Sequence, residues 1–125
     1  MPRTEVLFYQ ETNGETPFIE WIEGLPPEGA VTCAARLARL ERLGHEIRRP
    51  EADYLRDGIY ELRARNQGVN YRMLYFFHGK VAIVVSHGFS KQQAAVPSRE
   101  IERALRRKAA FEADPAAHTF RPGSA

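Results

Sequence analysis

The chain has 125 residues, of which 43% are hydrophobic and 27% are charged. This length fits one domain, and the composition is that of a folded globular protein rather than a disordered one. The formal net charge of +2 hides an asymmetry, because residues 1–30 hold one basic and six acidic residues, whereas residues 31–125 hold 17 basic and 10 acidic ones. The basic part fits a face that binds a polyanion, and equally the solvated surface of a protein with 15 arginines and three lysines.

Several kinds of protein are excluded by what the sequence lacks. Cys33 is the only cysteine, which excludes an intramolecular disulfide and a zinc site built from cysteines. The four histidines are scattered and there is no glycine-rich phosphate loop, so we expect neither a metal nor a cofactor. The longest apolar run, residues 81–85, is too short to cross a bilayer. We therefore expect a cytoplasmic protein without membrane contact.

The first half of the chain predicts one strand and two helices. Residues 6–9 are apolar and aromatic, as in a strand. Thr16 and Pro17 suit the start of a helix, which the next pair of prolines ends. A second, amphipathic helix is predicted over residues 28–43, with Gly44 as its stop.

The second half changes to an alternating pattern and then back to a helical one. Three strands are predicted, at residues 58–65, 69–77 and 81–89, and the short turns between them favour an antiparallel meander. A helix is predicted over residues 98–113, whereas residues 115–125 show no periodicity and read as a flexible tail. The order of elements predicts one α+β domain over residues 1–114, with an antiparallel sheet, two N-terminal helices packed on one face and a C-terminal helix.

Strand geometry brings several basic side chains together. A two-residue turn after Phe77 would make Arg72 and His87 diagonal neighbours on one face of the sheet. The preceding turn decides whether Arg63 joins them, because a connection of two or four residues puts Arg63 opposite Arg72, whereas one of three residues sends it to the other face. Lys91, just after the last strand, could reach the same place.

Such a cluster suits cleavage of RNA without a metal, in which the 2′-hydroxyl attacks the adjacent phosphate. Arginine and lysine can stabilise the developing charge, and His87 can exchange a proton near neutral pH. The alternative interpretation is structural. In that case Arg63 pairs with Glu61 or Glu46, and His87 is a packed core residue next to Phe89.

Three motifs follow one another in the second half: LRDGIYELR at residues 55–63, NYRMLY at 70–75 and HGFSK at 87–91. In this order and spacing they resemble the HigB-like branch of the RelE/ParE toxin superfamily. The resemblance implies a RelE-like fold, ribosome-dependent cleavage of mRNA, and a cognate antitoxin, often with a helix-turn-helix DNA-binding domain. It also implies a basic catalytic site that includes Arg63, Arg72 and Lys91. RNA contacts are expected from Arg65, Tyr71 and Lys91, and Tyr71 could stack on a base.

The chain departs from the best-studied branch of that superfamily in three places. Glu61 stands where that branch has a second basic residue, no tyrosine stands near Val96, and the usual lysine pair is Lys91-Gln92. His87 would therefore perform more of the proton transfer, or catalysis would depend on ribosomal RNA. Two other functions stay open on the same scaffold: inhibition of DNA gyrase, as in the ParE-like branch, and non-catalytic binding of RNA or protein.

Overall fold

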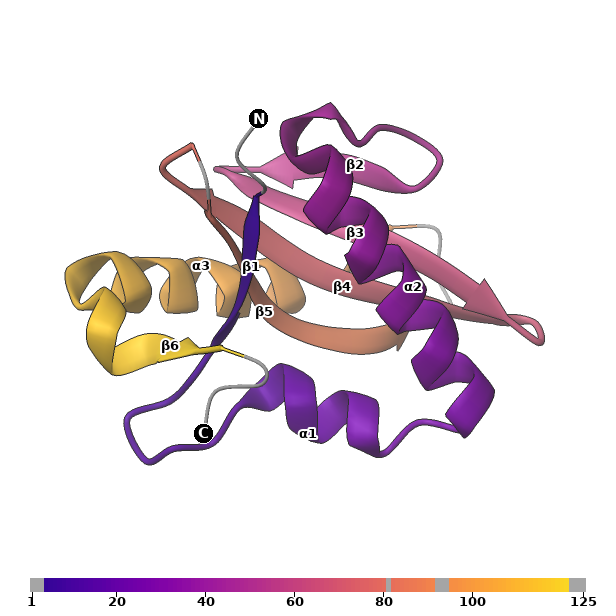
Figure 1. Cartoon of the computed structure of the whole chain (residues 1–125), viewed down its shortest axis with the longest axis horizontal. Helices are drawn as coiled ribbons and strands as arrows, with labels where there is room; N and C mark the ends of the chain where they lie inside the picture. The colour runs from indigo at the N-terminus through magenta and orange to yellow at the C-terminus, as the bar shows by residue number, and fades with distance from the viewer. Residues whose placement is uncertain (1–3, 81, 92–94, 122–125) are drawn as a thin grey trace.

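Six strands form one sheet, in the order β2-β3-β4-β5-β1-β6 (Figure 1). The computed structural model describes residues 4–80, 82–91 and 95–121. Its strands are β1 (Glu5–Tyr9), β2 (Ala52–Arg56), β3 (Ile59–Asn66), β4 (Val69–His78), β5 (Ala82–Lys91) and β6 (Thr119–Phe120). Its α-helices are α1 (Pro17–Glu23), α2 (Pro27–Leu43) and α3 (Ser98–Ala113). Neighbouring strands pair antiparallel, except β1 and β5, which are parallel.

Helices cover both faces of this sheet. On one face, α1 and α2 bury Phe18 and Leu40 in a cluster with Met73 of β4. On the other face, α3 buries Phe111 against Phe76, with 5.8 Å between the ring centroids. Figure 1 shows α1 and α2 in front of the sheet and α3 behind it. The predicted α+β fold is confirmed and is consistent with the RelE-like fold, with the C-terminal helix on the face opposite the two N-terminal helices.

Two tight hairpins fix the register of β2, β3 and β4. Asn66 pairs with Val69 across Gln67 and Gly68, whose φ angles are 48° and 80°. Positive φ at both central residues is typical of the type I′ turn, whose twist matches that of the strands. The connection therefore has two residues, which puts Arg63 opposite Arg72, as one of the two predicted registers required. The β2–β3 hairpin uses the same kind of turn, with positive φ at Asp57 and Gly58. Strand β2 itself was not predicted from the sequence.

The β4–β5 hairpin differs from the predicted one and contains a bulge. His78 pairs with Ala82, so three residues connect the strands instead of two. This change alone would move every later residue of β5 to the other face. The register shifts once more between Leu74 and Tyr75, because Leu74 pairs with His87 and Tyr75 pairs with Val85. The extra residue in β5 returns His87 to the face of Arg72, which is the arrangement predicted from a different register.

Part of the segment predicted to be a flexible tail is ordered. Residues Pro115–His118 form a 3₁₀ helix, and β6 then pairs antiparallel with β1. The His118 ring stacks on Tyr9, with 5.1 Å between centroids, and its Nδ1 lies 2.8 Å from the carbonyl oxygen of Gln10. These contacts cover the β1 edge, which would otherwise expose unpaired backbone groups. Within the described residues, no helix is both long enough and apolar enough to span a membrane.

Candidate functional site

Two arginines and a buried glutamate meet on the α3-facing side of the sheet. Arg63 on β3 lies opposite Arg72 on β4, and Glu61 precedes Arg63 by two residues on the same face. Oε1 of Glu61 accepts hydrogen bonds from Nε of Arg63 at 2.6 Å and from Nε of Arg72 at 3.0 Å. The Glu61 side chain is 3% exposed, whereas those of Arg72 and Arg63 are 12% and 30% exposed. The buried carboxylate therefore offsets the repulsion between the two guanidinium groups.

The ion pairs continue to the edge strand β2. Nη2 of Arg63 lies 3.4 Å from Oδ2 of Asp53, which also accepts a hydrogen bond from Nη2 of Arg49 at 2.8 Å. That hydrogen bond is the main reason why the pKa of Asp53 lies below its ordinary value. A chain of alternating charges thus runs from Arg49 at the edge through Asp53, Arg63 and Glu61 to Arg72.

This face of the sheet becomes exposed towards the β3–β4 turn. Arg65 is exposed and lies opposite Asn70, whose Oδ1 accepts a hydrogen bond from Nη1 of Arg65 at 3.3 Å. Lys91 pairs with Asn70 from the other side at the end of β5, and its side chain lies outside the described part of the chain. Phe89 lies opposite Arg72 and is half-buried. The pairing thus lines up basic residues of three strands beside an aromatic ring.

His87 shares this face but is buried beneath α3. Its side chain is 6% exposed, with Nδ1 2.8 Å from Oγ of Ser86 and Nε2 3.1 Å from Oε1 of Glu100. Burial, assisted by the nearby charge of Arg107, lowers the pKa of His87 to about 4, so the ring is neutral at pH 7. The predicted catalytic role is not supported by this position, because the first turn of α3 separates the ring from solvent. Its packing beside Phe89 matches the structural alternative.

Tyr71 lies on the opposite face of the sheet. It is 3% exposed, and its ring centroid is 6.0 Å from that of Trp21. A Cβ atom at Gly29 of α2 would lie 2.6 Å from the Tyr71 hydroxyl, so a larger residue in α2 would clash with it. The predicted stacking of Tyr71 on an RNA base is therefore not supported, because alternation along β4 separates Tyr71 from Arg72 and packs it under two helices.

A family match covers most of the chain. Residues 20–109, from α1 through most of α3, match the family described as phage derived protein Gp49-like (DUF891). The chain belongs to this family. Gp49-like proteins are typically of the RelE/HigB toxin type, which supports a toxin-like, phage-derived protein. No curated protein matches the chain.

The Gp49-like site is suited to binding a phosphodiester. Among the described groups, none accepts a hydrogen bond from Nη1 of Arg63 or Nη2 of Arg72. The planar guanidinium group donates in a geometry that matches phosphate oxygens, and the half-buried Phe89 ring can pack against a base. Glu61 places a carboxylate next to both arginines. The described residues contain no group of three or more His, Cys, Asp or Glu that could hold a metal ion.

Three residues of this Gp49-like site were not predicted as functional. Glu61 was considered only as a structural partner, although a glutamate inside the apolar run of β3 signals a buried charge that needs a cation. Phe89 was named only as the neighbour of His87, and its pairing opposite Arg72 is what shows that it borders the basic face. No local pattern relates Glu100 to His87, because 13 residues separate them and the contact depends on where α3 packs.

Proposed function

We propose that this Gp49-like protein is the toxin of a toxin–antitoxin pair and cuts mRNA on the ribosome, without a metal, through the 2′-hydroxyl. The observation that supports the proposal best is the pairing of Arg63 with Arg72 around Glu61, at the end of the sheet where Arg65 is exposed. The family supports the toxin class. We further propose a cognate antitoxin, of the helix-turn-helix type, as the partner that silences the protein, and the cytoplasm as its location.

In the proposed reaction, Arg63 and Arg72 bind the non-bridging oxygens of the scissile phosphate. Their charges stabilise the pentavalent transition state, in which negative charge on those oxygens is greatest. The 2′-oxygen attacks phosphorus as its proton passes to Oε2 of Glu61, which accepts no hydrogen bond from a described residue and is not fully buried, in contrast to the His87 ring. The bond to the 5′-oxygen breaks as that oxygen takes a proton from water, and the proton held by Glu61 then neutralises the hydroxide that remains. Lys91, by its position in the strand pairing, would add a third positive charge.

The proposal assigns His87 a positioning role, in contrast to the prediction from sequence. Direct proton exchange between His87 and RNA would require Glu100 and the first turn of α3 to move away from the ring. In the observed arrangement, His87 instead links β5 to α3 and so holds the helix beside the basic face. Glu61 is the acid–base group that already contacts both phosphate-binding arginines.

Primer extension on a defined mRNA, with and without 70S ribosomes, tests this proposal. Wild-type protein should cut only when ribosomes are present, and Arg72→Ala should lower the rate about 100- to 1,000-fold, the usual effect of removing one group that stabilises the transition-state charge. Arg63→Ala, at a more exposed position, is the second variant in case Arg72→Ala does not fold. Arg42→Ala, an exposed arginine of α2, is the matched control and should cut at the wild-type rate.

The same experiment separates the competing functions. Cleavage that persists in Arg72→Ala and Arg63→Ala would contradict the assigned site. Growth arrest on expression, without any cleavage, would favour a gyrase inhibitor, which a supercoiling assay with purified gyrase can detect. Ribosome binding without cleavage would favour a non-catalytic binding module.

A further inference from the structure

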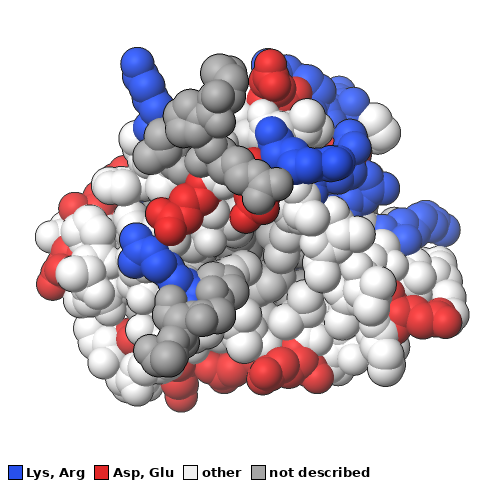
Figure 2. All heavy atoms as spheres, viewed as in Figure 1, with Lys and Arg blue, Asp and Glu red and all other residues white. Residues whose placement is uncertain are grey.

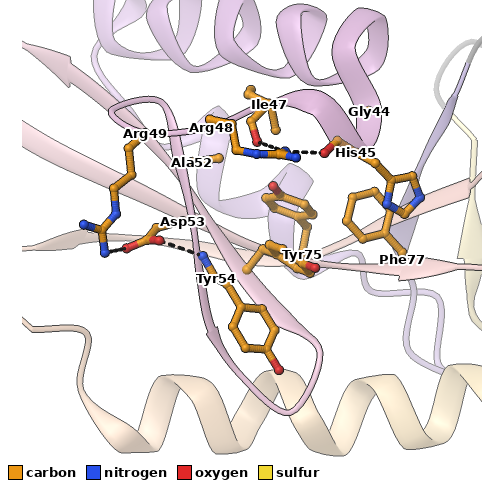
Figure 3. A pocket seen from close by; sticks show the side chains of 11 residues that line it. Gly44, His45, Ile47, Arg48, Arg49, Ala52, Asp53, Tyr54, Tyr75 and Phe77 are labelled. Carbon is orange, nitrogen blue, oxygen red and sulfur yellow. Dashed lines mark hydrogen bonds and ion pairs between the residues drawn. The ribbon is translucent and has the colours of Figure 1, made fainter.

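A pocket lies at the sheet edge, on the face that carries α2. It has a volume of about 640 Å³ and is bounded by the loop between α2 and β2 and by strands β2, β3 and β4 (Figure 3). This volume is within the usual range of sites for small ligands. The pocket is separate from the Arg63–Arg72 pair, which lies on the α3-facing side.

Aromatic rings dominate the lining of this pocket. Tyr54, Tyr60, Tyr75, Phe77 and His45 all line it, and Figure 3 shows the rings of His45, Tyr75 and Phe77 close together, with Tyr54 apart from them on β2. Three of these rings are unusually exposed, since Tyr54 is 51% exposed and Tyr60 and Phe77 are only half-buried, whereas the Tyr75 ring is buried. His45 already stacks on Phe77, with 3.7 Å between centroids, which shows that a planar heterocycle fits against that ring. Exposed ring faces of this kind bind other planar groups.

The pocket also offers polar groups that could orient a ligand. The hydroxyl of Tyr75 makes no hydrogen bond to another described residue. Among the described residues, every fully buried polar side-chain atom has a hydrogen-bond partner, so this hydroxyl is not fully buried and opens onto the pocket that Tyr75 lines. Burial raises the pKa of Tyr75, which keeps the hydroxyl protonated and able to donate. Arg48 is held above the rings by donating to the carbonyl oxygens of Ile47 and His45.

Positive charge surrounds the entrance. Figure 2 shows Lys and Arg side chains over the C-terminal half of α2 and the loop after it, whereas acidic side chains gather along the edge where α1 lies. Of these arginines, Arg48 and Arg49 line the pocket, whereas Arg36 and Arg39 of α2 are ion-paired with Glu51. The Arg49 side chain is 74% exposed and lines the pocket, so its guanidinium group can reach an anionic group attached to a bound ring. Aromatic faces next to arginine favour a nucleotide over a neutral ligand.

Asp53 connects this pocket with the proposed RNA site. It lines the pocket, accepts a hydrogen bond from Arg49 at 2.8 Å, and lies 3.4 Å from Nη2 of Arg63 on the other side of the edge strand. Because β2 is the last strand of the sheet, no further strand blocks the way around it. A strand of RNA held by Arg63 could therefore pass over this edge and present its next base to the rings.

We propose that the aromatic pocket binds a nucleobase, with the attached phosphate on Arg49. The inference deepens the proposed function and rests on it, because the base would belong to the RNA that the Arg63–Arg72 pair contacts. A free nucleotide has the same ring and phosphate and is the other possible source of this ligand.

The test uses NMR spectroscopy of the full ¹⁵N-labelled chain. The probes are adenosine 5′-monophosphate, adenosine, ribose 5-phosphate and a 2′-O-methyl tri-adenylate, which cannot be cut through a 2′-hydroxyl. Adenosine 5′-monophosphate should shift amide signals of residues 44–54 and of Phe77. Tyr60→Leu, which keeps the apolar bulk, should weaken its binding about 5- to 100-fold, the range expected for one lost stacking contact. Phe120→Leu, a half-buried ring on β6, is the matched control and should bind like the wild type.

Further variants keep the test decisive. Tyr54→Ala, at an exposed position, replaces Tyr60→Leu if that variant does not fold. Arg49→Ala should weaken binding of adenosine 5′-monophosphate and leave adenosine unchanged. Tri-adenylate that binds about tenfold more tightly than the mononucleotide supports RNA as the source, whereas equal affinities support a free nucleotide. Amide shifts confined to other surfaces, or wild-type binding by both tyrosine variants, would overturn the proposal and favour a protein partner on these rings.

The two proposals can fail separately. Arg72→Ala should abolish ribosome-dependent cleavage. Because Arg72 lies outside the pocket, binding of adenosine 5′-monophosphate should persist in this variant. If the mononucleotide binds but no RNA is cut by the wild type, only the endoribonuclease function is refuted. If RNA is cut at the Arg63–Arg72 site and no probe shifts the pocket signals, only the nucleobase site is refuted.

Discussion

The pH dependence of stability tests whether His87 is a neutral, structural residue. In the unfolded chain, a histidine has a pKa of about 6.5, whereas burial under α3 lowers the pKa of His87 to about 4. Between pH 6.5 and pH 4, His87 is therefore protonated in the unfolded state and neutral in the folded state. The contribution of His87 to the stability of the fold is therefore complete above about pH 6.5 and is lost as the pH falls towards 4. The groups that face the ring are Ser86, Glu100, Arg103 and Arg107.

The size of this effect follows from the pKa difference. The difference between a pKa of about 6.5 and one of about 4 corresponds to about 3 kcal/mol of folding free energy, most of which should be lost between pH 7 and pH 4.5. Other acidic groups in ion pairs also weaken the fold in acid, so the measurement compares wild type with His87→Gln. Urea unfolding at both pH values should show that the wild type loses about 2–3 kcal/mol more than the variant. His45→Gln, at an exposed position, should behave like the wild type.

Two results would refute this reasoning. The first is an equal loss of stability in wild type and His87→Gln between pH 7 and pH 4.5. The second is an NMR titration of the His87 ring with a midpoint near 6.5. Either result would mean that the ring takes up a proton near neutral pH, and the proton-exchange role predicted from the sequence would then be restored.

Three further outcomes are expected from the packing of the sheet. Arg72→Met leaves the buried Glu61 with one arginine partner and should lower the free energy of unfolding, measured in urea, by about 2–3 kcal/mol. This loss is smaller than the usual cost of breaking a buried ion pair because Arg63 remains. Adding Glu61→Gln should recover part of the lost stability. Gly88→Ala puts a Cβ 2.3 Å from the Trp21 ring and should lower the melting temperature by several degrees through overpacking. Deletion of residues 115–125 removes β6 and should increase amide exchange in β1, measured by mass spectrometry.

The sequence was most informative where short turns and alternation determine the geometry. The Gln67-Gly68 pair fits a two-residue connection, and that connection alone determines that Arg63 faces Arg72. The helices were also predictable, because their apolar residues recur at helical spacing and Gly44 ends α2 with a positive φ of 54°. By contrast, β2 was not predicted, although Asp57-Gly58 carries the same type I′ signal as the second hairpin.

The remaining features depend on contacts between distant segments. His87 lies on the predicted face only because a bulge in β5 compensates for a turn one residue longer than expected, and no sequence pattern marks either change. Its burial depends on Glu100, which reaches it from α3. The aromatic pocket likewise forms where the loop after α2 meets three strands, so His45 and Tyr75 become neighbours of one cavity through tertiary packing alone.

The charges of the site explain how it can be both stable and receptive to RNA. Along the row from the edge of the sheet, three cations (Arg49, Arg63 and Arg72) alternate with two anions (Asp53 and Glu61), which gives a net charge of +1. The two carboxylates allow the arginines to pack side by side without an external ion. The net positive charge that remains, together with that of the exposed Arg65, would attract a phosphate group. In the proposed reaction, a glutamate at position 61 therefore need not oppose RNA binding, because it holds side by side the two arginines that would bind the phosphate and would accept the proton of the 2′-hydroxyl.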